Sequence, residues 1–213
     1  MDNRYVKIFA SGSKAPLKAT PGHFATNHAH INYYLDMTTL KTRLSEAQEV
    51  AKHLAERFLF DKVVDTIVCL EGTQVIGAYL AEELTRAGVL STNAHKTIYV
   101  ITPEYNSNSQ MVFRENILPM VHGKNVVILT AVVTTGLSLN KSIEAIQYYG
   151  GKLQSAAAVF STLDELNGCP ITSIYSPEDV TDYLYYDYRK CPLCEKGIKL
   201  DALVNAYGYT TLG

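Results

Sequence analysis

The chain has 213 residues, is 47% hydrophobic and 19% charged, and carries a formal net charge of -2. This length and composition suit one globular domain with a sizeable core. The lack of a basic excess argues against nucleic acid or an anionic membrane surface as a partner. No apolar run reaches the length of a membrane span, and the first residues lack the apolar segment of a secretory signal, so we expect a cytoplasmic protein. Four cysteines in a chain of this size do not indicate a disulfide scaffold.

The first part of the chain, residues 1–43, shows no clean periodicity and is expected to form an irregular N-terminal cover. Within it, the stretch HINYYLDM (30–37) is a candidate strand. From Leu44 to Phe58 the pattern changes, because apolar residues recur every three or four positions. This spacing predicts an amphipathic helix.

Short β-rich runs then alternate with helical segments. Residues 65–70 (DTIVCL) predict a strand, the turn Glu71-Gly72-Thr73-Gln74 follows, and a second helix is expected to run to about Ala87 and end at Gly88. Residues 96–102 predict the next strand.

The remaining segments continue this alternation. Residues 103–122 begin polar and rich in turn residues, which favours a mobile loop in part of this segment. A strand is expected to end at Leu129, followed by a turn from Thr130 to Ser138 and a helix from about 137 to 149. Further strands are predicted at 152–161 and 171–176.

Strands that alternate with helices predict a mainly parallel α/β sheet with helices on both faces. We therefore expect one domain over residues 1–213. It would consist of an N-terminal cover (1–43), an α/β core (44–176) and a Tyr-rich C-terminal appendage (177–213), with both covers irregular.

The turn from Thr130 to Ser138 is the first candidate site. In a doubly wound sheet, ligands bind outside the carboxyl ends of the strands. Gly136 permits close backbone approach, Thr134 and Thr135 offer hydroxyl groups, and the following helix presents free N–H groups and its positive dipole end to an anion. A phosphate is the expected ligand. The alternative is a plain strand-to-helix connection in which Thr and Ser only cap the helix.

Three segments resemble the type I phosphoribosyltransferases, which use phosphoribosyl pyrophosphate (PRPP). VVILTAVVTTGLS is similar to the PRPP signature, in which a buried strand runs into two acids and then T-T-G-x-T/S. CLEGTQVIGAYLA is similar to the segment that holds the pyrophosphate, although Gln74 stands where a glycine is common. HINYYLDM resembles a segment near the start of orotate phosphoribosyltransferases.

The resemblance implies a role for each matched segment. The 5′-phosphate would be held by the signature turn, namely by Thr134, Thr135, Gly136, Leu137 and Ser138. The pyrophosphate would lie on Glu71, Gly72, Thr73 and Gln74, and the base near His30 and Tyr34. The resemblance also implies Mg²⁺ bound with PRPP, and a homodimer.

The sequence departs from the family at two places. Thr130 and Ala131 replace the paired carboxylates that would hold the ribose hydroxyls, and Arg114 is the one basic residue within 103–122, which makes it the candidate catalytic residue. Acids could instead approach from elsewhere in the chain, the candidates being Asp36, Glu71 and Glu104.

Two functions from different classes follow from this pattern. The first is a PRPP-dependent, orotate-like phosphoribosyltransferase that transfers phosphoribosyl to a nucleobase and releases pyrophosphate, so that we lean toward an enzyme. The alternative is a catalytically impaired PRPP- or nucleotide-binding protein with a regulatory role.

The pair Cys191 and Cys194, followed by Gly197, resembles half of a zinc knuckle. A closed tetrahedral zinc site needs two more ligands. Cys169, a histidine or the same pair of a second subunit are the candidates for a structural Zn²⁺ site. The alternative is two unligated thiols in a packed tail.

Overall fold

The structure is a computed structural model that describes residues 5–56, 62–86, 92–93 and 97–212. Its centre is a six-stranded sheet in the order β10-β11-β9-β8-β4-β5. All neighbouring strands in it pair in parallel except β10, which pairs antiparallel with β11. The strands are β4 (Thr66–Cys69), β5 (Tyr99–Ile101), β8 (Asn125–Val133), β9 (Lys152–Ser161), β10 (Glu165–Leu166) and β11 (Cys169–Tyr175).

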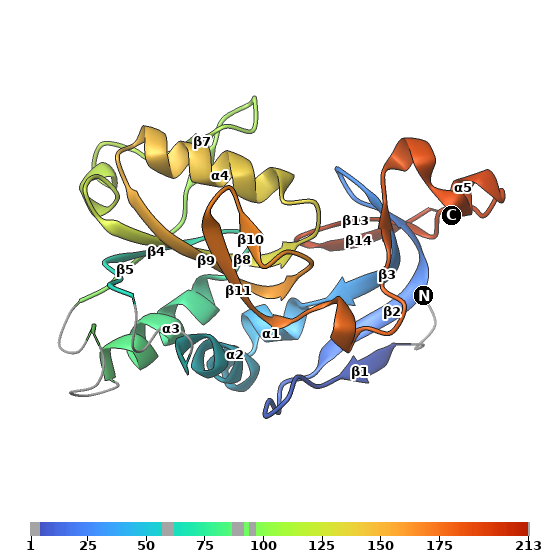
Figure 1. Ribbon diagram of the computed structural model, residues 1–213, viewed down its shortest axis with the longest axis horizontal. Coiled ribbons are helices and arrows are strands. Elements are labelled where there is room, and N and C mark those ends of the chain that lie inside the picture. Colours follow the sequence, from blue (N-terminus) through green and yellow to red (C-terminus); the bar gives the residue numbers. More distant parts are fainter. Residues whose placement is uncertain (1–4, 57–61, 87–91, 94–96, 213) are drawn as a thin grey trace.

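Helices cover both faces of this sheet. α2 (Leu44–Glu56) and α3 (Gln74–Arg86) lie on one face, and α4 (Leu137–Tyr148) lies on the other (Figure 1). Because successive side chains of a strand point to opposite faces, β8 contributes to two cores. Val127 and Leu129 pack with the helices α2 and α3, whereas Val126 and Ile128 pack with α4. The predicted α/β class with a mainly parallel sheet is confirmed.

A second sheet joins the two ends of the chain. Its strand order is β12-β3-β2-β13-β14, and β1 also pairs with β2, in antiparallel orientation. β13 pairs in parallel with β2, so that Ala202 lies opposite Phe24. The strands are β1 (Val6–Ile8), β2 (Leu17–Ala25), β3 (His30–Asp36), β12 (Tyr185–Tyr186), β13 (Ala202–Asn205) and β14 (Gly208–Thr211).

The N-terminal cover is therefore more regular than its sequence indicates. The candidate strand at 30–37 is confirmed as β3. The long strand β2 escaped prediction because its register with β3 shifts between Pro21 and Phe24. Such a bulge interrupts the period of two on which strand prediction depends.

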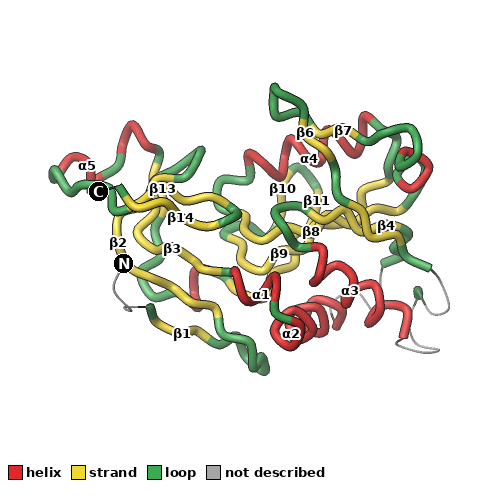
Figure 2. The backbone as a smooth tube through the Cα atoms, turned by 180° about the vertical axis from the view of Figure 1, so that it is seen from behind, coloured by secondary structure: helices red, strands yellow, loops and turns green. Residues whose placement is uncertain are grey.

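Residues 103–122 form a small hairpin rather than a loop throughout. β6 (Glu104–Tyr105) pairs antiparallel with β7 (Met111–Val112), and a 3-10 turn, η2 (Leu118–Met120), follows. Figure 2 shows the hairpin beside α4, in agreement with the contacts between α4 and β7. The mobility expected for this segment stays a prediction. The other short elements are α1 (Thr38–Thr42), η3 (Pro177–Asp179), η4 (Tyr188–Lys190) and α5 (Pro192–Glu195).

Most predicted helices and strands agree with the structure, with one correction at the site. The strand β8 was expected to end at Leu129 but continues to Val133, because β9 pairs with it along that whole length. Thr130 and Ala131 thus lie in a strand. The predicted helix ends at Phe58 and at Ala87 with Gly88 fall outside the described residues, as does Lys96. None of the described helices combines the length and apolar character needed to cross a membrane.

Candidate functional site

The site lies where β4 ends and β8 continues. Cys69, the last residue of β4, is in register with Leu129 of β8. Beyond that point no strand among the described residues pairs with β8 on the β4 side, and the carboxylate of Glu71 lies there instead. Its Oε2 accepts hydrogen bonds from Thr130 Oγ1 at 2.9 Å, from Ala131 N at 3.2 Å and from Val132 N at 3.4 Å.

The turn that carries Glu71 is held in an unusual backbone conformation. Glu71 has φ 55° and Gly72 has φ 79°, both in the left-handed region. A residue with a side chain rarely adopts this conformation, which is found more often at functional sites. Thr73 fixes the turn, because its buried hydroxyl donates to Leu70 O at 2.7 Å and lies 3.1 Å from Leu129 O. The predicted pyrophosphate turn is thus tied to the end of β8.

A buried lysine, which sequence reasoning missed, faces this turn. Lys41 of α1 is 7% exposed. Its Nζ donates to Glu71 O at 2.9 Å and to Ala206 O. A Cβ added at Gly72 would lie 3.8 Å from this Nζ. Burial lowers the pKa of Lys41, while the carboxylates of Glu71 and Asp36 act in the opposite direction. No sequence signal separated Lys41 from the surface lysines, since its burial depends on packing by distant segments.

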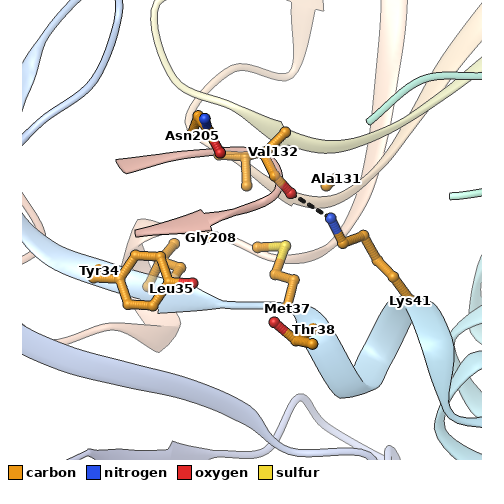
Figure 3. A pocket seen from close by; sticks show the side chains of 10 residues that line it. Tyr34, Leu35, Met37, Thr38, Lys41, Ala131, Val132, Asn205 and Gly208 are labelled. Atoms are coloured by element: carbon orange, nitrogen blue, oxygen red, sulfur yellow. Dashed lines mark hydrogen bonds between the residues drawn. The ribbon is translucent and has the colours of Figure 1, made fainter. Parts of the chain in front are cut away.

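A pocket opens beside Lys41 and is walled by both sheets. Figure 3 shows its lining side chains and the hydrogen bond of Lys41. β3 and α1 provide one wall, Ala131 and Val132 of β8 a second, and the turn between β13 and β14 a third. The lining residues are Tyr34, Leu35, Met37, Thr38, Lys41, Ala131, Val132, Asn205, Ala206 and Gly208. The C-terminal segment is therefore part of the site.

Tyr34, a predicted base contact, lines this pocket with little exposure. Its ring meets that of Tyr209 edge to face, with centroids 5.2 Å apart. Burial, together with the nearby groups of Asp36 and Tyr209, raises the pKa of Tyr34 to about 12. The hydroxyl is therefore neutral at physiological pH and can act as a hydrogen-bond donor.

The predicted phosphate turn leads from β8 into α4. Gly136 has φ 75° and is the N-cap of the helix, and Leu137 and Ser138 of the first turn are exposed. A Cβ at Gly136 would lie 3.1 Å from Leu163 Cδ1 and 3.2 Å from Leu166 Cδ2. The glycine is thus required by its positive φ and by the two leucines. The open side of the turn is the helix N-terminus, where the first N–H groups lack acceptors within the helix.

A second residue missed from the sequence supports the same turn. Tyr183 is 7% exposed and its hydroxyl is hydrogen-bonded to the side chain of Thr134. Burial raises the pKa of Tyr183 to about 12, with the hydrogen bond acting in the opposite direction. The ring packs edge to face on Phe160, with centroids 4.9 Å apart. A residue of the C-terminal segment thus holds the Thr134 hydroxyl.

Arg114, the candidate catalytic residue, lies after β7 and is paired with an acid. Its Nη2 and Nε donate to Glu104 Oε2 at 2.7 and 2.9 Å, and both side chains are exposed. The hydrogen bond and charge of Arg114 lower the pKa of Glu104. Of the three acids considered as substitutes for the missing pair, Glu71 reaches Thr130, Glu104 pairs with Arg114, and Asp36 accepts from Thr38 N at 2.9 Å.

The Cys191 and Cys194 pair lies away from the pocket, with His23 and His30. One ligand atom of each of these four residues lies within 4.8 Å of the others. Cys169, the other candidate ligand, is buried in β11, outside this group among the described residues.

A parallel sheet with a Thr-Thr-Gly turn at its carboxyl edge, roofed by a second sheet, is the architecture of the type I phosphoribosyltransferases. No protein-family model matches the chain. Among solved structures, orotate phosphoribosyltransferase of Mycobacterium tuberculosis H37Rv, in complex with Fe(III) dicitrate, superposes with a TM-score of 0.53 at 16% identity, over 78% of this chain and 93% of that one. The same enzyme in complex with PRPP gives 0.52 at 16% identity, over 69% and 82%.

Curated relatives point to the same branch. Orotate phosphoribosyltransferase of Desulforamulus reducens is 26% identical over 180 residues, which cover 83% of this chain and 85% of the relative. The enzyme of Pelotomaculum thermopropionicum gives the same values, 26% over 180 residues, 83% and 85%. The resemblance to orotate phosphoribosyltransferase-like members of the type I family is thereby confirmed. Since these relatives are transferases, they agree with the expectation that leaned toward an enzyme.

Proposed function

We propose that the protein is a PRPP-dependent phosphoribosyltransferase of the orotate-like branch, which transfers phosphoribosyl to a nucleobase and releases pyrophosphate. The observation that carries this proposal is the position of the Glu71 carboxylate, 2.9 Å from Thr130 Oγ1. An acid from the neighbouring turn thus contacts Thr130 and Ala131, the two residues that correspond to the family's paired acids.

In this proposal the 5′-phosphate binds at the N-terminus of α4. The exposed first turn at Leu137 and Ser138 presents backbone N–H groups and the positive end of the helix dipole. The hydroxyl of Thr135, which lies 3.5 Å from Leu137 N, stands in the same turn, and Thr134 and Gly136 shape it.

The ribose would lie along Thr130 and Ala131, with its hydroxyls toward Glu71. Only Oε2 of Glu71 engages the protein donors of β8. The second carboxylate oxygen can therefore accept from a ribose hydroxyl. A charge-assisted bond of this kind contributes about 1.5–3 kcal/mol.

The pyrophosphate would lie on the turn Glu71, Gly72, Thr73 and Gln74, at the start of α3, with Lys41 as its cation. A leaving group that gains negative charge is stabilised by a fixed positive charge in a water-poor site. The residues present fit Mg²⁺, which prefers oxygen ligands and keeps phosphates and water in its shell. Because the second oxygen of Glu71 is assigned to the ribose, the ion when bound would be held mainly by pyrophosphate oxygens and water, and it would neutralise pyrophosphate charge.

The base would lie beside Tyr34 at the mouth of the pocket, because the pocket itself, with a volume of about 30 Å³, is too small to admit a base. The other predicted base contact, His30, is the first residue of β3, four residues before Tyr34. Four residues of a strand span roughly 13 Å. His30 also lies beside Cys194, so that Tyr34 is the stronger candidate for base binding.

The decisive experiment combines binding with turnover in a matched pair of lysine variants. Calorimetry with PRPP and Mg²⁺, and pyrophosphate release with orotate and with purine bases, are measured for the wild type, Lys41→Met and Lys52→Met. Lys52 is an exposed residue of α2 and serves as the control. We expect PRPP affinity to fall about 10–100-fold in Lys41→Met alone, because one charged hydrogen bond to its pyrophosphate group is lost. Absence of PRPP binding by the wild type would refute the proposal.

One observation favours the alternative function, a PRPP- or nucleotide-binding protein without turnover. The charge of Arg114 is already compensated by Glu104, so that little free positive charge remains on the β6–β7 hairpin. PRPP binding without pyrophosphate release for any base would support this alternative. The homodimer, the cytoplasmic location and the division into core and covers stay predictions.

A further inference from the structure

We propose that His23, His30, Cys191 and Cys194 bind one structural zinc ion, which ties the C-terminal segment to the N-terminal strands. The four residues come from β2, β3 and the two ends of α5. Nothing in the proposed transfer reaction uses them.

Four of the six distances between the ligand atoms are close to those of a tetrahedral zinc shell, and all six are within 4.8 Å. With Zn–S near 2.3 Å and Zn–N near 2.0–2.1 Å, ligand atoms at tetrahedral angles lie about 3.3–3.8 Å apart. His23 Nε2 lies 3.2 Å from His30 Nδ1, 3.5 Å from Cys191 Sγ and 3.7 Å from Cys194 Sγ. Cys194 Sγ lies 3.3 Å from His30 Nδ1. A set of two imidazoles and two thiolates selects zinc among the common divalent ions.

Hydrogen bonding alone does not account for this arrangement. His23 Nδ1 lies 2.9 Å from the carbonyl oxygen of Ile198, which can only accept, so that the proton of His23 is on Nδ1. The single lone pair of Nε2 then faces His30 Nδ1, Cys191 Sγ and Cys194 Sγ, although it can accept only one good hydrogen bond. A metal ion at their centre satisfies all four atoms. The bond to a backbone carbonyl is also the usual orienting contact of a zinc-bound histidine.

The backbone around His23 is shaped to aim this ring. The register of β2 with β3 shifts between Pro21 and Phe24, and His23 lies within this bulge. Bulges commonly re-aim a side chain. The bulge is anchored by Asp201, whose Oδ2 accepts from His23 N at 2.7 Å. A Cβ at Gly22 would lie 2.7 Å from the same oxygen, so a glycine is needed there.

The segment that carries the cysteines is joined to β3 through β12 but buries little apolar surface. Between Tyr183 and Ala202, all of which is described, Cys191 is the one buried residue. A stretch this exposed buries too little apolar surface to offset its ordering, and small metal sites commonly supply the missing stability. The proposed ion would displace one proton from each thiol as it binds.

The test measures bound metal and thiol reactivity in the full-length protein. We expect about one zinc per chain by plasma mass spectrometry in the wild type and in His28→Ala, and loss of that zinc in His30→Ala and in Cys194→Ala. His28 is the matched control because it lies two residues from His30 but outside the cluster. Cobalt(II) added to the zinc-free wild type should give the visible spectrum of a tetrahedral thiolate site.

A second measurement keeps the test valid where a variant misfolds. Cys194 is exposed, whereas the other three cysteines are buried. In the wild type, zinc should slow the reaction of Cys194 with a thiol reagent by at least tenfold, and chelation should restore it. Equal reaction rates with and without Zn²⁺, stoichiometric iron in place of zinc, or a metal-free Cys191–Cys194 disulfide in the purified protein would each overturn the proposal.

Discussion

Replacing Glu71 by glutamine tests the central contact of the proposed ribose site. The variant keeps the size of the side chain but removes its charge. The donors Thr130 Oγ1, Ala131 N and Val132 N then meet a neutral acceptor, or an amide nitrogen if the group is turned. Removing the charge lowers a hydrogen bond from about 1.5–3 to about 0.5–1.5 kcal/mol, and the 2.9 Å bond to Thr130 should account for most of the loss.

We therefore expect Glu71→Gln to lower the free energy of unfolding by about 1.5 kcal/mol, or Tm by roughly 3–6 °C for a chain of this size. If the other carboxylate oxygen holds a ribose hydroxyl, PRPP affinity should also fall about 5–10-fold. Calorimetry with PRPP and Mg²⁺ measures the second effect, and thermal denaturation measures the first.

The matched control is Glu56→Gln, because Glu56 is an exposed acid of α2 whose carboxylate lies near His53 rather than β8. It should leave both quantities close to those of the wild type. A Glu71→Gln protein that loses stability but binds PRPP as tightly as the wild type would refute the ribose role and leave Glu71 with a purely structural one.

Three further predictions follow from the same edge of the sheet. Gly136→Ala should lower the free energy of unfolding by about 1–2 kcal/mol and weaken phosphate binding, because φ 75° is unfavourable for alanine and its Cβ would press on Leu163. Urea denaturation and phosphate calorimetry measure these effects, and an unchanged urea midpoint would contradict the prediction. Thr130→Asp should lower the free energy of unfolding by about 2 kcal/mol, since it removes the hydroxyl that donates to Glu71 and adds a like charge beside it. The double variant with Glu71→Gln should recover part of this loss in urea denaturation, and a double variant whose loss equals the sum of the two single losses would argue against the contact. The pKa of Tyr183 is raised to about 12 in the folded protein, so between pH 10 and 12 the folded protein keeps a proton that the unfolded chain has lost. The free energy of unfolding should therefore fall as pH rises through this range. Denaturation at a series of pH values should show a shallower fall for Tyr183→Phe.

The sequence predicted those features that depend on neighbouring residues. Helical periodicity predicted α2, and the Thr-Thr-Gly sequence before a helical pattern predicted the turn at Gly136 that precedes α4. Thr130 and Ala131 were expected in that turn but lie in β8, and their role in ribose binding stays a prediction. These signals are local, because each depends on a hydrophobic period or on a backbone conformation within about ten residues.

The rest of the site depends on distant contacts that no local pattern records. Lys41 is buried because the turn at Ala206 covers it, 165 residues later in the chain. The second pair of candidate metal ligands, His23 and His30, became recognisable only when the bulge of β2 brought them beside Cys191, 168 positions from His23. Sequence reasoning could name a histidine as the missing ligand type but not which one.

The parallel pairing of β2 with β13 has a consequence for biosynthesis. A ribosome emits Phe24 long before its partner Ala202, so the edge of β2 at Phe24 and Ala25 stays open until Ala202 and Leu203 have been made. Elongation at about 5–20 residues per second makes that interval roughly ten seconds or more. The α/β core can assemble meanwhile, whereas the turn between β13 and β14 that covers Lys41 can pack only later. Nascent molecules therefore pass through a stage in which this short strand edge is exposed, and exposed edges of this kind favour aggregation in a crowded cell.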